Sequence, residues 1–460
     1  MGLLQKEFPK LLTRSGFVLI CRVSGAVIAF ATQIMMARWM GATELGIYVY
    51  AFALSMLLST IAALGLPAAS LRFISQYLVD NKTTFINGFI SKGRKMILIS
   101  SLCVGSAALF ILVAVSVSIS VTEIKTIDDN VSLTLLFAST ESVKKYHAPV
   151  VISIICIPVI ALFRFHDRIA HAFSWFVLSF LPSMTLRPLC FLIALYVIWA
   201  LTGSLSAEIA MIIQLCVIVV IASAQFVLLR SKIKKRIKDD SAEYEQSLWL
   251  RTAIPLLIIT VFTQYFPELS IIIIGTDLPL DKIAIYNASY RTALLIGFVY
   301  NSVSAAIVPK VSQLYAKGDV LGMQRYITRA TQLNFFLSML GIGIFAFSGE
   351  FLLAFFGKEF IAGYSALLIL SLAQLFVAGV GPVAILLNIT GHQDKCLYAF
   401  SASIVLALLL EWYLVPEFGL IGAAMMVLFV MIFWSLWLHF LVKRYLDIHA
   451  SIFSFLVVRN

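Results

Sequence analysis

Charged residues are scarce in this chain: only 12% are Asp, Glu, Lys or Arg, whereas 61% are hydrophobic. The mean hydropathy of +0.99 exceeds what the core of a soluble protein could bury. The alternating ten-residue segments of an outer-membrane barrel are also missing, and long apolar runs in lipid must be helical because hydrocarbon cannot satisfy exposed backbone groups. The composition therefore excludes a soluble protein and predicts an all-α, polytopic membrane protein.

Motifs for catalysis, metal binding and disulfide formation are missing as well. The six histidines are scattered, without an HExxH motif, a close carboxylate pair or a Gly-rich phosphate loop. The six cysteines lie in or beside apolar segments without CxxC spacing, which is typical of reduced packing residues. The apolar run after Arg14 is long enough to span a membrane, so no cleavable signal is expected. The sequence thus predicts no metal site, no cofactor and no enzymatic activity.

About twelve apolar segments are long enough to cross a bilayer, which takes roughly 20 residues each. They start near residues 14, 44, 95, 147, 186, 206, 249, 284, 332, 362, 395 and 419. Of 34 Lys and Arg residues, six lie in the loops of one side, Arg22 and Arg291 lie within segments, and 26 lie on the other side. The positive-inside rule makes that side cytoplasmic and places both termini there. This distribution explains the net charge of +11 by topology and argues against nucleic acid as a partner.

A strongly charged run after the sixth segment divides the chain. Residues 231–248 predict a cytoplasmic linker between two six-helix lobes, at 14–230 and 249–442. The tripeptide at 46–48 recurs in similar form at 284–286, which predicts lobes related by a pseudo-twofold axis along the membrane normal, with a substrate path at their interface. The basic residues 1–13 are expected to form an interfacial helix on the inner leaflet or a frayed tail, and residues 443–460 a cytoplasmic tail.

Charged side chains inside membrane segments are the first candidates for a functional site, because a central charge costs roughly 2.5–3.5 kcal/mol on insertion scales. Arg22 lies about two turns into the first segment. It shares one helix face with Ala26, Ala29 and Gln33, all small or polar. We expect Arg22 and Gln33 to line a substrate cavity, and the alternative is an Arg22 that snorkels to the inner interface.

A second candidate lies on the seventh and eighth segments. Glu268 follows Pro267, whose missing N–H should loosen the helix, and shares a stripe with Gln264. Arg291 follows Asn287 by one turn. At 1.5 Å per residue, Glu268 and Arg291 lie about two turns from the outer ends of antiparallel neighbours, so they could pair. The sequence predicts either a gate or ion-coupling pair or a static structural pair, with Gln264, Asn287 and Arg291 contacting substrate.

Several short stretches, in their order and spacing, resemble a known family. They are residues 37–48 (ARWMGATELGIY), 64–67 (LGLP), 285–291 (IYNASYR), 309–319 (PKVSQLYAKGD), 356–360 (FGKEF) and 381–391 (GPVAILLNITG). With them, nearly the whole chain resembles the O-antigen type of polysaccharide and oligosaccharide flippases, in the multidrug/oligosaccharidyl-lipid/polysaccharide exporter superfamily.

The resemblance implies twelve helices in two lobes, alternating access, and movement of undecaprenyl-pyrophosphate-linked sugar repeat units from the inner to the outer leaflet of a bacterial inner membrane. This step would serve the synthesis of a surface polysaccharide, either the O-antigen of lipopolysaccharide or an exopolysaccharide. A buried arginine suits a pyrophosphate through charge-assisted hydrogen bonds. The implied partners are this lipid-linked oligosaccharide and membrane lipids, and association with a polysaccharide polymerase stays open.

Other classes compete with this interpretation. Within the superfamily, the alternatives are a lipid II flippase and a drug or cation antiporter, although drug exporters often carry an acidic residue in the first segment, where this chain has Arg22. A membrane-bound polymerase or acyltransferase would need acceptor chemistry in large loops, and the longest outer loop, about 121–146, contains no histidine. A non-transporting scaffold would show no flux that depends on Arg22 or Arg291. The sugar and the coupling ion, H⁺ or Na⁺, cannot be read from the sequence.

Overall fold

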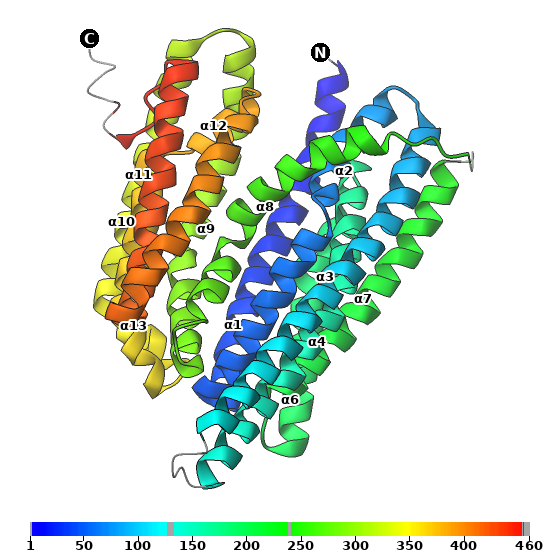
Figure 1. Cartoon of the computed structure of the whole chain (residues 1–460). Coiled ribbons are helices and arrows are strands. Elements are labelled where there is room, and N and C mark those ends of the chain that lie inside the picture. The colour runs from blue at the N-terminus through cyan, green and yellow to red at the C-terminus, as the bar shows by residue number, and fades with distance from the viewer. Residues whose placement is uncertain (1, 127–132, 238–240, 453, 455–460) are drawn as a thin grey trace. The chain divides into compact units, whose positions relative to one another are not determined.

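The computed structural model describes residues 2–126, 133–237, 241–452 and 454, and all regular secondary structure in them is helical (Figure 1). In chain order the elements are α1 (Gly2–Ala62), α2 (Leu66–Val79), α3 (Thr83–Thr126), α4 (Leu133–Ala172), α5 (Phe176–Phe180), the π-helix η1 (Leu181–Leu186), α6 (Arg187–Thr202), α7 (Ala207–Arg236), α8 (Gln246–Ile274), α9 (Leu280–Ala316), α10 (Val320–Ala354), the 3₁₀-helix η2 (Lys358–Gly363), α11 (Tyr364–Val380), α12 (Val383–Ile389) and α13 (Gln393–Leu446).

Within these described residues, ten helical segments are long and apolar enough to cross a membrane. Two of them, Gly16–Ala62 and Asp394–Leu446, have 47 and 53 residues, more than twice the length that a bilayer requires. Each is broken at a glycine with positive φ, Gly41 at 75° and Gly419 at 55°. Each is therefore two membrane helices joined by a tight turn, and the described helices give the twelve crossings that the sequence predicts.

The chain forms two compact units. The N-terminal unit comprises Met1–Met40 and Ile47–Val261. In it, α4 packs against α2, α3 and α7. Its core contains Phe89, which lies 5.9 Å from the ring of Phe165 and edge-on to Trp249 at 5.1 Å. Buried aromatic side chains of this size contribute most to core stability, so these three rings stabilise the core of the unit.

The C-terminal unit comprises Gly41–Gly46 and Phe262–Asn460. Here α11 packs against α9, α10 and α13. The short turn at 41–46 is held by Glu359, whose Oε1 accepts a hydrogen bond from the Ala42 N–H at 2.9 Å. Gly46 packs directly on the carbonyl of Leu280, where a Cβ would clash. The turn between the first two membrane helices thus belongs to this unit.

The boundary between the units differs from the predicted linker at 231–248. Helix α7 continues to Arg236, and the segment after it is tied to the N-terminal unit. Tyr77 donates to Glu245 Oε2 at 2.6 Å and accepts from the indole N–H of Trp249 at 3.0 Å. Burial, followed by the Glu245 hydrogen bond, raises the pKa of Tyr77 to about 12, so the phenol remains a donor at neutral pH. The chain passes between the units inside α8, after Val261, because Trp249 and Ala253 are buried in the N-terminal core.

The two ends of the chain are also more structured than predicted. Helix α1 begins at Gly2, so the proposed interfacial segment runs into the first membrane helix without a break in the backbone. At the other end, α13 extends to Leu446, and the next residues pack inside the C-terminal unit. The backbone of His449 makes two hydrogen bonds with the Gln324 amide, at 2.7 and 2.8 Å, and Ala450 is fully buried. The first part of the predicted free tail is therefore anchored.

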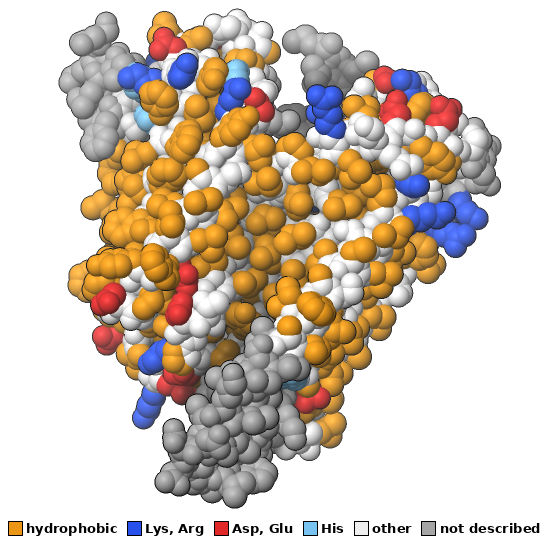
Figure 2. Space-filling model, in the orientation of Figure 1, with side chains coloured by type: hydrophobic (Ala, Val, Ile, Leu, Met, Phe, Trp, Pro, Cys, Tyr) orange, Lys and Arg blue, Asp and Glu red, His pale blue; other side chains and the backbone are white. Residues whose placement is uncertain are grey.

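Hydrophobic side chains cover the lengths of the helices on the face drawn in Figure 2, and charged side chains gather towards helix ends. Many large apolar side chains of the described residues are exposed, such as Phe110 at 74% and Phe347 at 96%. An exposed apolar surface of this extent is the surface that lipid covers.

Candidate functional site

Helix α8 bends at the level of the predicted gate. Tyr265 has non-helical dihedral angles, φ −125° and ψ 17°, two residues before Pro267. A proline ring removes one helical hydrogen bond and clashes with the carbonyl four residues earlier, so the bend that Pro267 predicts is confirmed. Glu268 follows directly and is buried.

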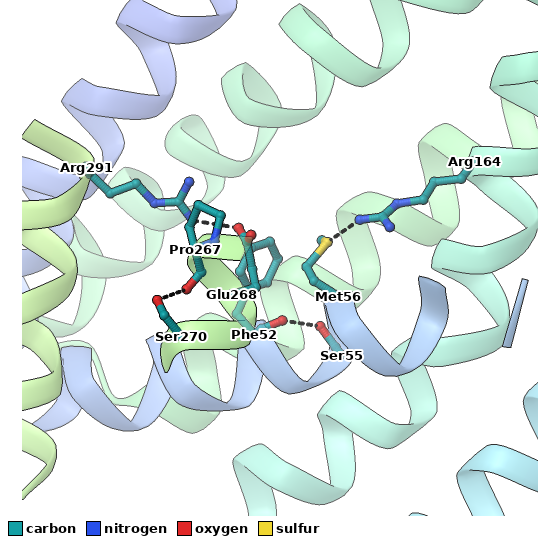
Figure 3. A network of polar contacts seen from close by, with 8 residues as sticks. All are labelled: Phe52, Ser55, Met56, Arg164, Pro267, Glu268, Ser270 and Arg291. Carbon is teal, nitrogen blue, oxygen red and sulfur yellow. Dashed lines mark hydrogen bonds and ion pairs between the residues drawn. The ribbon is translucent and has the colours of Figure 1, made fainter. Parts of the chain in front are cut away.

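Arg291 of α9 and Glu268 of α8 form the ion pair that the sequence predicts. Arg291 Nη2 lies 2.8 Å from Glu268 Oε1, and the two side chains point toward one another in Figure 3. The Arg291 side chain is 30% exposed and that of Glu268 is 10% exposed. Pairing is thus confirmed, whereas its action as a gate stays a prediction.

The ion pair leaves polar atoms unused. Among the described residues, none bonds to Glu268 Oε2, to Arg291 Nε or to the buried phenol of Tyr290. A buried polar atom without a partner costs about 1–3 kcal/mol. An anion that approached Arg291 could therefore satisfy a free N–H in addition to replacing the carboxylate.

The other two predicted residues of this site lie on the same helices. Gln264 is exposed, one turn before Glu268, and Asn287 is buried, one turn before Arg291. A hydrogen-bonded chain joins the two helices close by: Tyr286 donates to Ser270 Oγ at 3.1 Å, and Ser270 donates to the Pro267 carbonyl at 2.8 Å. The four predicted residues thus share helices α8 and α9, and contact of Gln264 and Asn287 with substrate stays a prediction.

Arg22 and Gln33 lie on α1 in the N-terminal unit. Gly25, nearly one turn after Arg22, packs against the Met184 carbonyl of η1. Arg22 is exposed together with Ala26 and Ala29, and its guanidinium lies 6.0 Å from the ring centroid of Phe180. Gln33 is partly buried. The face that carries Arg22 is therefore open within its own unit, as a substrate-lining face requires.

A third arginine was counted with the cytoplasmic loop charges and was missed as a site residue. Arg164 of α4 donates to Thr60 Oγ1 at 2.5 Å and to Met56 Sδ at 2.7 Å, the latter drawn in Figure 3. Thr60 and Arg22 are each nineteen residues from Gly41, on the two helices that meet there. At 1.5 Å per residue they lie at the same depth. The uninterrupted apolar run before Arg164 was the available signal.

A fourth arginine, Arg94, adds positive charge to the N-terminal unit. Arg94 of α3 donates to His166 Nε2 at 3.0 Å and stacks over Phe226 at 4.9 Å. Its Nη2 is buried and has no hydrogen-bond partner among the described residues. Arginine is suited to such positions because its planar fork binds phosphate groups in a bidentate manner.

The described residues contain no group of three His, Cys, Asp or Glu side chains that could hold a metal ion. What they do contain is a set of long apolar helices that carry arginines within each of the two units, with one incompletely satisfied ion pair. These features define a polytopic helical membrane protein with charged groups inside its membrane segments, which mark a candidate functional site.

The comparisons with known proteins give the family. A family model described as "Polysaccharide biosynthesis protein" matches residues 12–315, well over half of the sequence, and the chain belongs to that family. The chain is 24% identical over 195 residues to the probable low-salt glycan biosynthesis flippase Agl15 of Haloferax volcanii. It is 22% identical over 246 residues to the capsular polysaccharide biosynthesis protein CapF of Staphylococcus aureus. These alignments cover 42% and 53% of this chain and 41% and 61% of the relatives, less than two thirds of either.

Solved structures show the same fold. The lipid II flippase MurJ in an inward closed conformation matches with a TM-score of 0.68 at 15% identity, over 96% of this chain and 91% of MurJ. An inward-facing MATE family transporter of the MOP superfamily matches with a TM-score of 0.65 at 15% identity, over 92% and 98%. The predicted fold class is thereby confirmed.

Proposed function

We propose that this protein is a flippase that moves undecaprenyl-pyrophosphate-linked oligosaccharide repeat units from the inner to the outer leaflet of a bacterial inner membrane. The product would serve synthesis of a surface polysaccharide such as O-antigen or exopolysaccharide. Both termini then lie in the cytoplasm, in keeping with the 26 basic residues assigned to that side. Membership of the polysaccharide biosynthesis family and the likeness to glycan flippases support this class.

The observation that carries the proposal is the ion pair of Arg291 and Glu268. A guanidinium held at 2.8 Å by one carboxylate oxygen, with its Nε unused, is a preformed site for a diphosphate. Removing one partner of a buried pair costs about 3–5 kcal/mol, so the pair separates only when a second anion compensates Arg291. Substrate arrival thus supplies the energy that opens the pair.

Two arginines at different depths in their own helices would bind the substrate at successive stages of transport. Arg22 lies in the inner half of its membrane helix, where we infer that it meets the pyrophosphate entering from the inner leaflet. Arg291 lies about three turns from the outer end of α9, where it would receive the same group later in the cycle. Alternating access then exposes these positions to one leaflet at a time, while polar side chains such as Gln33 and Gln264 hydrogen-bond sugars.

A deletion strain tests the function. Loss of the gene should abolish surface polysaccharide and cause lipid-linked repeat units to accumulate on the cytoplasmic face of the inner membrane. Accumulation on the outer face would identify a polymerase, and accumulation of lipid II would identify the peptidoglycan branch of the superfamily. Unchanged surface polysaccharide would contradict the proposal. Re-expression of the wild-type chain is the control for each phenotype.

A further inference from the structure

The turn between α4 and α5 carries a stacked pair of aromatic side chains. The ring centroids of Phe173 and Trp175 lie 4.7 Å apart, and the rings are nearly parallel, at 12°. Ser174 between them has a positive φ of 60°, and the N–H groups of Ser174 and Trp175 donate to the carbonyls of His171 and Ala170. Phe173 belongs to the buried core of the N-terminal unit, and Trp175 packs against that core. The two rings are therefore fixed in position.

Two cations from the last turns of α7 lie over these rings. Lys232 Nζ lies 5.5 Å from the Trp175 ring, and the guanidinium of Arg236 lies 5.5 Å from the Phe173 ring. A cation and an aromatic face attract one another at such distances. Ile233 of the same helix is buried in the core that contains Phe173. The aromatic pair thus holds two positive charges, one helical turn apart, on one face of α7.

The charges of Lys232 and Arg236 stay available to an external anion. Both side chains are exposed, and the ion pairs within the described part of the chain all join other residues. The first described acidic side chains after α7, Glu243 and Glu245, accept hydrogen bonds from side chains of α3 and α2 instead. The dipole of α7 favours positive charge at its carboxyl end, but it does not select one face of the helix.

The surface beside these cations is apolar towards the membrane. Leu228, one turn before Lys232, is 54% exposed, and Val177, two residues after Trp175, is 56% exposed. Along α7, Leu228, Lys232 and Arg236 follow one another at one-turn spacing, so an apolar contact precedes two cations on one face. A phospholipid has its acyl chain and phosphate in the same order. Tryptophan rings, moreover, lie at the headgroup level of membranes.

We propose that Lys232, Arg236 and Trp175 form a binding site for the phosphate headgroup of one anionic phospholipid, whose acyl chain lies along Leu228. Both cations offer charge-assisted hydrogen bonds to phosphate, and the arginine fork can bind two of its oxygens. Basic groups at the ends of membrane helices attract anionic lipids in general, and the aromatic pair makes this face of α7 specific. In the orientation predicted from the basic residues, the lipid belongs to the inner leaflet. It would hold the N-terminal unit to that leaflet.

The experiment is equilibrium binding of fluorescent phosphatidylglycerol to the purified full-length protein in a non-ionic detergent, with fluorescent phosphatidylcholine as the neutral comparison. The wild type should bind phosphatidylglycerol more tightly, and the difference should shrink as salt is added. Lys232→Gln combined with Arg236→Gln should weaken phosphatidylglycerol binding about thirtyfold, about fivefold for each charge, and leave phosphatidylcholine binding unchanged. Lys232→Arg combined with Arg236→Lys should keep most of the affinity.

The matched control is Arg230→Gln combined with Lys234→Gln. These two residues are exposed and have the same charge and spacing, but at about 100° per residue they lie on the opposite side of α7. The control should change phosphatidylglycerol binding less than twofold. All four side chains are exposed, so each double variant should keep the wild-type melting temperature. If the Lys232 and Arg236 double variant fails to fold, Lys232→Gln alone decides, with about a fivefold loss.

Three results would overturn the site. Equal affinity of the wild type for the two lipids would show that the face does not select charge. Equal losses in the two double variants would show a general attraction to the basic end of α7. Binding of undecaprenyl pyrophosphate that requires Lys232 and Arg236, with phosphatidylglycerol binding that does not, would assign the face to the transported substrate. The assay measures no flux, so its outcome is independent of the proposed flippase activity.

Discussion

At the scale of single residues, the pair of Glu268 and Arg291 is both the best predicted feature and the most consequential one. Helical spacing and the antiparallel arrangement of neighbouring spans placed the two residues at equal depth, and the structure joins them at 2.8 Å. A static pair and a gate have the same geometry at rest. They differ in what happens when the charges are removed or exchanged.

Neutralising either partner should do more harm than exchanging the two. Arg291→Ala leaves the buried Glu268 carboxylate uncompensated and should destabilise the protein by about 3–5 kcal/mol, seen as a lower melting temperature and lower abundance. Glu268→Gln leaves Arg291, whose side chain is 30% exposed, and should cost less because solvent screens its charge. Glu268→Arg combined with Arg291→Glu should restore abundance but not export, because the guanidinium has moved away from its position on α9. Export restored by the exchanged pair would assign Arg291 no role in anion binding. If the exchange restores neither property, the gate hypothesis fails.

Arg22 should matter for transport and not for folding. Its side chain is exposed within its unit and no ion pair to it is found in the described part of the chain, so Arg22→Ala should abolish surface polysaccharide at unchanged protein level. Arg22→Lys should restore export only in part, because an ammonium lacks the planar fork. The matched control is Arg38→Ala, at the outer end of the same helix, which should export normally. Loss of folded Arg22→Ala protein would instead favour a structural role.

At the scale of elements, the number and positions of the membrane helices could be predicted because hydropathy integrates over about 20 residues. The bend at Pro267 was likewise visible in the sequence. The π-helical turn at Leu181–Leu186 and the burial of Ala450 were not, since both depend on contacts between distant segments. Arg164 was missed for a different reason: it was grouped with the loop charges, although the apolar run before it marks it as part of a membrane segment.

The break between α11 and α12 should be intolerant of a side chain. Gly381 has φ 90°, and a Cβ there would clash with the Ala450 carbonyl and lie 2.6 Å from Thr331 Oγ1. Gly381→Ala should therefore lower stability by at least about 1–2 kcal/mol, measured by thermal unfolding in detergent. Gly343→Ala on α10 is the control: its Cβ meets nothing within 4 Å, so it should be neutral or stabilise by about 0.4–1 kcal/mol. Equal melting temperatures for the two variants would show that the break relaxes freely.

At the scale of the whole molecule, the distribution of charge and the division of the chain into two units give different information. Each unit includes a segment that neighbours the other unit in sequence: the turn at Gly41–Gly46 belongs to the C-terminal unit, and the first part of α8 belongs to the N-terminal unit. Sequence composition placed the division in the charged run at 231–248, because charge marks exposure to water. Charge does not indicate which hydrophobic core the next helix joins. The burial of Trp249 attaches the first part of α8 to the N-terminal unit.

The orientation of the protein in the membrane decides which arginine lies near the inner leaflet and which near the outer leaflet. Reporter fusions at Lys235 should be active in the cytoplasm and fusions at Lys144 outside it, because the loops that carry 26 basic residues are retained on the inner side. Lys282 and Lys317 provide an internal control. They stand at opposite ends of the 37-residue helix α9, so they must report opposite sides in either orientation. If Lys235 reports the outside while that control holds, Arg22 lies in the outer half and Arg291 in the inner half. The direction of transport proposed here would then be reversed.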